Sequence, residues 1–251
     1  MKKTIITALL SMASVAMAAG GTANLGSGIT GTWTEYNMQD SITTGTDSIT
    51  LPSSWGGPTA WITLDSAISL DQDQTLTFSY TYSSTTNNGI YGISFQGEGG
   101  ASAFMIGNTD YGTRDLAATT ATLGTTGFYQ NKAQNLRYNA GNSGDRFQTV
   151  TGGINLGAVS PGLVEATIAF DSTAAAFIMT LECGKQSKTL NLGSTVAFDT
   201  ISFSGDANTT QSFTGLSMNI TTAPNTAVPE PTTATLSLLA LAGLAARRRR
   251  K

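Results

Sequence analysis

The body of this chain alternates apolar and polar residues with a period of two. In residues 76–82, LTFSYTY, Leu and the aromatic side chains fall on one face of an extended strand, and Thr and Ser fall on the other. The alternation recurs at 90–95, 164–170, 177–183 and 213–220, with Gly, Asn, Ser and Thr between the segments. No helix-period stretch longer than about two turns lies between the ends of the chain. The pattern predicts an all-β fold, an antiparallel β-sandwich.

Asn88 and Gly89 lie between two of these segments. The Asn-Gly pair favours the backbone conformation of a two-residue hairpin turn. We therefore expect residues 76–82 and 90–95 to be neighbouring strands joined by a hairpin. Residues 19–223 are enough to bury one sizeable core and are expected to form a single domain.

The first 18 residues have the three parts of a secretory signal peptide. Lys2 and Lys3 precede an apolar run at 5–15, and Ala16 and Ala18 are the small residues that signal peptidase accepts at its cleavage site. An amphipathic first helix is the alternative, but the run has no polar face. The sequence predicts that signal peptidase removes residues 1–18.

The other end of the chain joins a short motif, an apolar run and a cluster of cations. A linker at 224–231 ends in Val-Pro-Glu-Pro, and the apolar run covers 234–246. As a helix this run reaches about 20 Å, short of a hydrocarbon core of about 30 Å, although counting from Thr232 it could just span. A plain tail anchor is therefore one interpretation. The residues that mark this end are Val228, Pro229, Glu230, Pro231, Arg247, Arg248, Arg249, Arg250 and Lys251.

This three-part arrangement resembles the PEP-CTERM sorting domain. The resemblance implies recognition by exosortase, a membrane-embedded enzyme that is taken to cut near the Pro-Glu-Pro and to release or transfer the protein outward. It implies a Gram-negative type of bacterium and a hydrophobic helix at 232–251 that contacts the inner membrane only transiently. The mature protein is then expected at the cell surface or in the extracellular matrix.

The mature body is acidic once both targeting segments are set aside. Residues 19–228 keep six of the thirteen Lys and Arg and fifteen of the sixteen acidic residues, so six minus fifteen gives a net charge of −9. An acidic body without a basic patch argues against nucleic acid and against anionic membrane surfaces as partners.

The chain has no histidine and a single cysteine, Cys183. A Ser-His-Asp triad and most zinc sites are therefore excluded, and no disulfide can form within the chain. Cys183 alternates with Phe177, Met179 and Leu181, so we interpret it as a buried apolar residue rather than a reactive thiol.

The carboxylates do not show the spacing of a glycosidase. Glu165 and Asp171 share a strand face but lie about 20 Å apart, beyond the roughly 5–10 Å that glycoside hydrolysis needs. Asp71 and Asp73 are close, but they lie in a polar turn that leaves both ionised. The chain is expected not to be an enzyme.

The sequence offers one candidate type of metal site, a calcium site with oxygen ligands. Asp71 and Asp73, or Asp110 and Asp115, could contribute together with backbone carbonyls. For each pair the simpler interpretation is a solvated turn that satisfies its own backbone. No other cofactor is expected.

The second half of the body resembles the concanavalin A-like, laminin-G-type jelly roll. The resemblance rests on residues 164–183, on TISFSG at 200–205 and on FTGLSMNI at 213–220. It implies recognition of glycans or proteins, in some members with calcium, and in some branches hydrolysis of β-glucans. An immunoglobulin-like or other sandwich stays open.

A glycan-binding face would need exposed aromatic side chains. Residues 97–153 are rich in Gly, Asn, Thr and Ala and are compatible with long loops over one face. On an extended strand, the side chain of Trp61 falls on the opposite face from Ala60 and Ile62. Because large aromatic side chains usually pack in the core, both an exposed and a buried position of Trp61 stay open. The candidate glycan-binding residues are Trp55, Trp61, Tyr111 and Tyr129.

Two classes of function remain open. The first is a non-enzymatic surface or matrix protein that exosortase sorts, with a lectin-like sandwich as a structural or adhesive module. The second is a dedicated carbohydrate-binding module of the cell surface, with polysaccharide as its partner. A glycoside hydrolase is the least favoured alternative.

Overall fold

The computed structural model describes residues 18–36, 41–53, 59–85, 91–97, 102–108, 115–119, 154–155, 162–205 and 209–223. Backbone contacts divide the chain into two units, residues 1–221 and residues 222–251. The architecture below is that of the first unit, and all regular structure within the described ranges is β-strand. No helix in these ranges is long and apolar enough to cross a membrane. Residues 1–17 of the predicted signal peptide and the predicted apolar tail helix lie outside the described residues.

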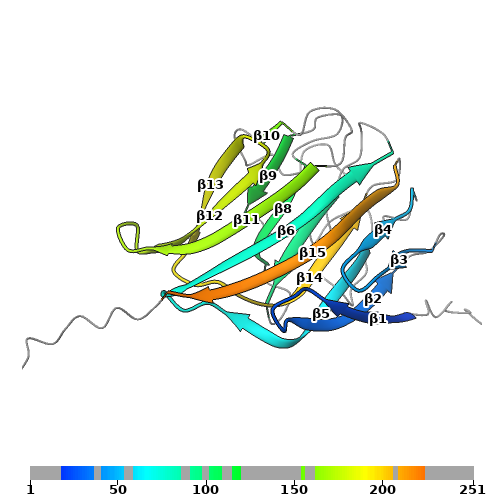
Figure 1. The fold of residues 1–251 in the computed structure, drawn as a ribbon, viewed down its shortest axis with the longest axis horizontal. Helices are drawn as coiled ribbons and strands as arrows, with labels where there is room; N and C mark the ends of the chain where they lie inside the picture. Colours follow the sequence, from blue (N-terminus) through cyan, green and yellow to red (C-terminus); the bar gives the residue numbers. More distant parts are fainter. Residues whose placement is uncertain are drawn as a thin grey trace, which may run out of the picture. The chain divides into compact units, whose positions relative to one another are not determined.

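The strands form two sheets that pack face to face (Figure 1). Sheet A contains, in spatial order, β1 (Ala18–Asn24), β2 (Thr30–Tyr36), β5 (Thr59–Ser69), β14 (Ala197–Gly205), β7 (Tyr91–Gln96), β8 (Ser102–Asn108), β9 (Asp115–Thr119) and β10 (Ile154–Asn155). Sheet B contains β13 (Gln186–Gly193), β12 (Ala176–Cys183), β11 (Gly162–Asp171), β6 (Gln74–Ser84), β15 (Gln211–Thr222), β4 (Ile49–Leu51) and β3 (Thr43–Thr44). The strand pairs with a described register are antiparallel. The predicted antiparallel β-sandwich is confirmed.

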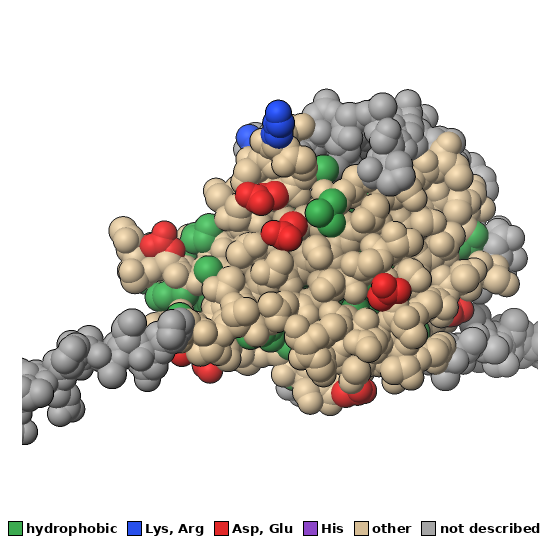
Figure 2. Space-filling model, in the orientation of Figure 1, with side chains coloured by type: hydrophobic (Ala, Val, Ile, Leu, Met, Phe, Trp, Pro, Cys, Tyr) green, Lys and Arg blue, Asp and Glu red, His purple; other side chains and the backbone are tan. Residues whose placement is uncertain are grey.

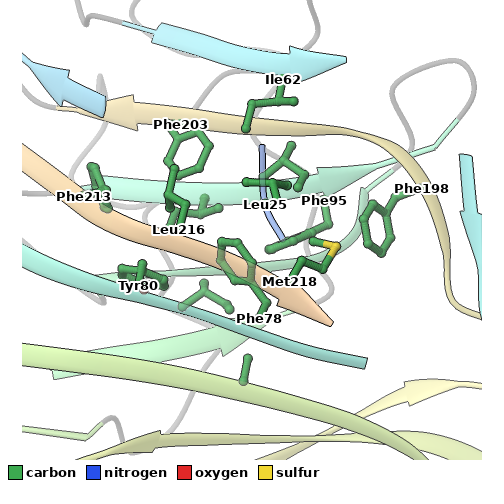
Figure 3. Close-up of a cluster of buried hydrophobic side chains, with 14 of the residues drawn as sticks. Leu25, Ile62, Phe78, Tyr80, Phe95, Phe198, Phe203, Phe213, Leu216 and Met218 are labelled. Atoms are coloured by element: carbon green, nitrogen blue, oxygen red, sulfur yellow. The ribbon is translucent and has the colours of Figure 1, made fainter. Parts of the chain in front are cut away.

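The core lies between the sheets and is built by the alternation seen in the sequence. In β6, Leu76, Phe78 and Tyr80 are buried, while the Thr and Ser residues between them are half-exposed. Aromatic rings from the two sheets meet edge to face, as between Phe78 and Phe95, whose ring centroids are 5.0 Å apart. Figure 3 shows these side chains converging from both sheets. Burial of this apolar surface is the main contribution to the stability of the fold.

The hairpin expected at Asn88-Gly89 is wrong. Residues 86–90 lie outside the described residues, but the strands on either side belong to different sheets: β6 to sheet B and β7 to sheet A. The neighbours of β6 are β11 and β15, and those of β7 are β14 and β8. The physical reason is that both segments carry an aromatic face. Opposed across the core, the two faces bury each other, whereas as neighbours in one sheet they would lie side by side.

The opposed faces also carry a buried hydrogen bond between the sheets. The hydroxyl oxygens of Tyr80 and Tyr91 are 3.1 Å apart in a site that is closed to solvent. Burial, by removing the phenolate from water, raises the pKa of both groups well above the ordinary value. In the unfolded chain they titrate near pH 10. Their contribution to stability is therefore fully present below pH 10 and is lost as the pH rises above it.

Replacing Tyr91 by Phe should lower the free energy of unfolding by about 1–3 kcal/mol, because the Tyr80 hydroxyl then stays buried without a partner. The double variant Tyr80→Phe/Tyr91→Phe should recover most of this loss, since both polar groups leave a site of unchanged shape. Urea denaturation at pH 7 measures both values. A double variant that is as unstable as the single variant would contradict the paired arrangement.

The last described strand, β15, lies in the interior of sheet B, between β6 and β4. It buries Phe213, Leu216 and Met218 in the core. The turn between β1 and β2 contacts it, because the Met218 amide donates to the Leu25 carbonyl over 2.6 Å. This turn contains Gly26 and Gly28, both with positive φ, a conformation that glycine adopts without strain. β15 thus connects the edge of sheet A with sheet B.

Residues 97–153 are not loops throughout. The described parts of this segment include β8 and β9, which extend sheet A beyond β7. Phe104 and Ile106 of β8 are buried in the core, where Phe104 stacks on Phe95 with ring centroids 4.1 Å apart. The sequence analysis missed β8 because residues 103–106 are all apolar, so the two faces of the strand show no apolar-polar alternation.

Candidate functional site

Trp61 lies on the outer face of sheet A, the face that points away from the core. Its neighbours in β5, Ala60 and Ile62, are fully buried, whereas Trp61 itself is half-exposed. Trp61 is paired with Thr34 of β2 on one side and with Ser202 of β14 on the other. Of the two positions that the sequence left open, the structure therefore places the side chain of Trp61 outside the core.

A cluster of neutral polar side chains continues this row across the sheet. Ser202 is paired with Ser94 of β7, and the amide nitrogen of Gln96 donates to the Ser94 hydroxyl over 3.1 Å. We call Ser94, Gln96 and Ser202 the polar cluster. Because they alternate with core residues, these side chains point to the outer face, yet they are at most 1% exposed. Sequence reasoning missed the cluster, since small polar residues between apolar ones are expected on a solvated face.

Two atoms of the polar cluster have no hydrogen-bond partner. They are the Ser202 hydroxyl oxygen and the Gln96 side-chain oxygen, Oε1. A buried polar group without a partner costs about 1–3 kcal/mol, and such groups are rare in native proteins. The outer face of sheet A thus combines a half-exposed indole with buried polar atoms that lack partners.

The other candidate aromatic residues lie outside the described residues. They are Trp55, Tyr111 and Tyr129. Ala16 of the predicted signal-peptidase site is also outside, and Ala18 is the first residue of β1. The tail residues 228–231 and 247–250 are outside as well.

Asp71 and Asp73 lie in the exposed turn between β5 and β6. The turn satisfies its own backbone, because the Gln74 amide donates to the Asp71 carbonyl and the Asp71 amide donates to the Gln74 side chain, each over 3.0 Å. Within the described residues no group of three or more Cys, Asp or Glu side chains is placed to hold a metal ion. Asp110 lies outside these residues, and Asp115 is the first residue of β9. The solvated-turn interpretation accounts for the geometry at Asp71 and Asp73.

The structure brings together two carboxylates that the sequence analysis did not pair. Glu165 of β11 lies directly opposite Glu182 of β12 on the outer face of sheet B. Directly opposed residues have Cβ atoms about 4.5–5.5 Å apart, so the like charges repel each other. Figure 2 shows acidic side chains side by side on this open face. The pairing follows from the turn after Asp171, where the Asp171 carboxylate accepts the Thr173 amide over 2.7 Å. Pairing the residues of the two strands one by one, starting from this turn, would have predicted from the sequence that Glu165 lies opposite Glu182.

Cys183 is half-buried rather than fully buried. It is the last residue of β12 and packs against the edge of the core, beyond the buried residues Met179 and Leu181. Burial raises the pKa of the Cys183 thiol, so the thiol stays protonated at neutral pH. This agrees with an apolar packing role for Cys183.

Comparison with known protein families identifies a sorting motif at the carboxyl terminus. Residues 227–251 match the PEP-CTERM protein-sorting motif, which confirms the resemblance stated from the Val-Pro-Glu-Pro sequence and the terminal Arg cluster. No curated protein matches the chain in sequence.

Among solved structures, the chain has partial similarity to carbohydrate recognition domains and lectins. The metal-free carbohydrate recognition domain of Emp46p is 13% identical over 76% of this chain and 88% of its own, with a TM-score of 0.43. A lectin from Bauhinia forficata in complex with GalNAc is 12% identical over 73% of this chain and 91% of its own, with a TM-score of 0.42. Lectin II from Ulex europaeus is 9% identical over 72% and 89%, with a TM-score of 0.39.

The motif and the fold together establish the class of the protein. The PEP-CTERM motif marks proteins that are exported and that exosortase sorts to the cell surface. The described part of the mature body is a sandwich of two antiparallel sheets. This chain is therefore an exported all-β protein that carries a PEP-CTERM motif, through which exosortase sorts it to the cell surface.

Proposed function

We propose that the mature protein is a non-enzymatic component of the cell surface or extracellular matrix, with its sandwich as an adhesive module for polysaccharide. The observation that carries this proposal is the PEP-CTERM motif at residues 227–251, because it directs the chain to the cell surface. Signal peptidase and exosortase are the processing partners. An acidic body with a net charge of −9 is unsuited to nucleic acid.

The arrangement of carboxylates supports a role without catalysis. Retaining glycosidases hold two carboxyl groups about 5–5.5 Å apart, with one of them kept protonated by its surroundings. Glu165 and Glu182 are close enough for such a pair, but Glu182 is exposed and both lie on an open sheet face. Nothing described on that face excludes water or would hold a sugar ring between the two groups.

The purified mature protein should therefore release no reducing sugar from β-glucans or xylans. The measurement is a reducing-end assay over several hours, with Glu165→Gln, Glu182→Gln and Asp71→Ala/Asp73→Ala as matched variants. Sugar release by the wild type that disappears in any of these variants would replace the proposal with a glycoside hydrolase.

A dedicated carbohydrate-binding module is the second candidate, and the half-exposed indole of Trp61 favours it. Glycan-array binding of the mature protein separates the two: a carbohydrate-binding module selects one narrow glycan class, whereas an adhesive matrix protein binds several related polysaccharides. We also propose a calcium ion at Asp71 and Asp73. If this ion takes part in polysaccharide binding, chelation by EDTA should weaken that binding.

A further inference from the structure

We propose that exosortase processes the folded sandwich, and that the short spacer between β15 and the sorting motif holds one end of the sandwich against the enzyme. The spacer is residues 223–226, between the end of β15 at Thr222 and the motif that begins at residue 227. Its length, rather than its sequence, then determines how fast the tail is processed. The proposal goes beyond the adhesive function and does not depend on it.

The first argument is that β15 fixes the chain close to the motif. β15 lies between β6 and β4 in sheet B, and its buried residue Met218 donates its amide to the Leu25 carbonyl. The Ser27 hydroxyl donates to the Asn219 side chain over 2.7 Å, and Ile220 packs against the core. Releasing the strand further back would expose core side chains to water. The chain is therefore fixed as far as Ile220.

The second argument is the reach of the chain beyond that point. Nine residue steps lead from Ile220 to Pro229, and they span at most about 30 Å when fully extended. A domain of about 200 residues has a radius of gyration of about 17 Å, so it is roughly 40 Å across. The connection is thus shorter than the domain is wide. A membrane-embedded protease that acts near Pro229 must therefore meet the folded domain.

The third argument is the strand order, which determines the end of the sandwich that meets the enzyme. The Thr85 amide after β6 donates to the Thr210 carbonyl before β15, so the start of β6 lies where β15 ends (Figure 1). The start of β6 is also paired with the end of β11. The turns at 70–73 and 172–175 therefore lie beside the end of β15, and we call them the exit end. The turn at 184–185 lies at the opposite end, because the end of β12 is paired with the start of β11.

The fourth argument is the order of events during export. Every described strand precedes the motif. The chain up to Thr222 has therefore crossed the membrane when the apolar tail stops in it. The sandwich can complete its core while the tail is still uncut, so exosortase acts on a folded domain.

The test follows processing of the full-length chain in a host that contains exosortase. One variant lacks residues 223–226, a second has Gly and Ser in place of these four residues, and a third has four Gly and Ser residues inserted after Ala223. Two further variants carry a small folded domain with adjacent termini, inserted either at 172–175 or, as the matched control, at 184–185. Both turns are exposed and suit such insertions. Intact mass measures processing, and protease resistance of the membrane-bound protein checks the fold.

We expect the deletion to slow processing about tenfold or more, because it shortens the reach from Ile220 to about 17 Å and draws the motif toward the domain. The Gly-Ser replacement and the longer spacer keep or extend the reach, so both should be processed at the wild-type rate. The insertion at 172–175 should also slow processing about tenfold or more, because it separates the exit end from the enzyme. The insertion at 184–185 should leave the rate unchanged.

Three results would overturn the proposal. Processing of the deletion variant at the wild-type rate would show that the spacer does not position the domain. Slow processing of the Gly-Ser replacement would show that its sequence is recognised instead of its length. Equal rates for the two insertion variants would show that the exit end does not face exosortase. The adhesive function is unaffected by these results, since polysaccharide binding of the mature protein tests it separately.

Discussion

Replacing Pro229, Glu230 and Pro231 with alanine should trap the full-length protein in the inner membrane, while the wild type reaches the cell surface without its terminal Arg cluster. The apolar run alone does not distinguish a sorting signal from an anchor. The affinity of an anchor depends on apolar length, at about 0.8 kcal/mol per buried CH₂. The triple substitution adds apolar surface and removes a charge, so a plain anchor would bind the membrane as tightly as the wild type or more tightly. The substitution blocks release from the membrane only if a protease recognises these three residues.

The measurement is the intact mass of protein from the surface fraction, by mass spectrometry. Replacing the four residues Arg247 to Arg250 with serine is the second variant, and it should also block processing. A control substitution within the described domain, Thr180→Ala, should be processed as the wild type is. A mature mass that still includes Lys251 would show that the chain is a tail-anchored protein instead.

Trp33→Ala should lower the free energy of unfolding by about 3–5 kcal/mol, the largest loss expected of a single change in the sandwich. Trp33 is fully buried in β2, and its ring lies 5.6 Å from that of Phe203 between centroids. Its indole N–H donates to the Gly45 carbonyl over 2.9 Å, which ties sheet A to the loop between β3 and β4 of sheet B. Truncation leaves a cavity of ring size and a carbonyl without its donor.

Trp61→Ala is the matched control, since it removes the same side chain from the neighbouring strand. Trp61 is only partly buried, on the outer face, so its loss should cost clearly less than the loss of Trp33. Urea denaturation followed by circular dichroism measures both variants against the wild type. Equal losses in the two variants would mean that the assignment of Trp33 to the core and of Trp61 to the outer face is wrong.

The sequence predicted the strands themselves well where the apolar alternation is unbroken. β6, β11 and β12 each contain a segment that the period of two had marked, with most of the expected side chains buried. This works because alternation is a local property: each strand needs one apolar face, whatever strand lies beside it. Where both faces of a strand are apolar, as at residues 103–106 in β8, the period of two is absent and the strand was missed.

The partners of each strand were decided only by the tertiary structure. Asn88-Gly89 is the strongest local hairpin signal in the chain, yet the strands on either side of it lie in opposite sheets. A turn preference acts over a few residues, whereas setting Phe78 against Phe95 and Tyr80 against Tyr91 buries four large rings at once. The burial of these rings outweighs the local preference of the turn.

The same division holds for the functional surfaces. The sequence by itself determined the sorting motif at 227–251, because exosortase reads a linear stretch of residues. For Trp61 it left an exposed position and a core position open, and the structure placed the side chain outside the core. It did not show that Ser202 and Gln96 would be buried beside that face, nor that Glu165 would oppose Glu182. Those neighbours come from strands far apart in the chain, and only strand order and register bring them together.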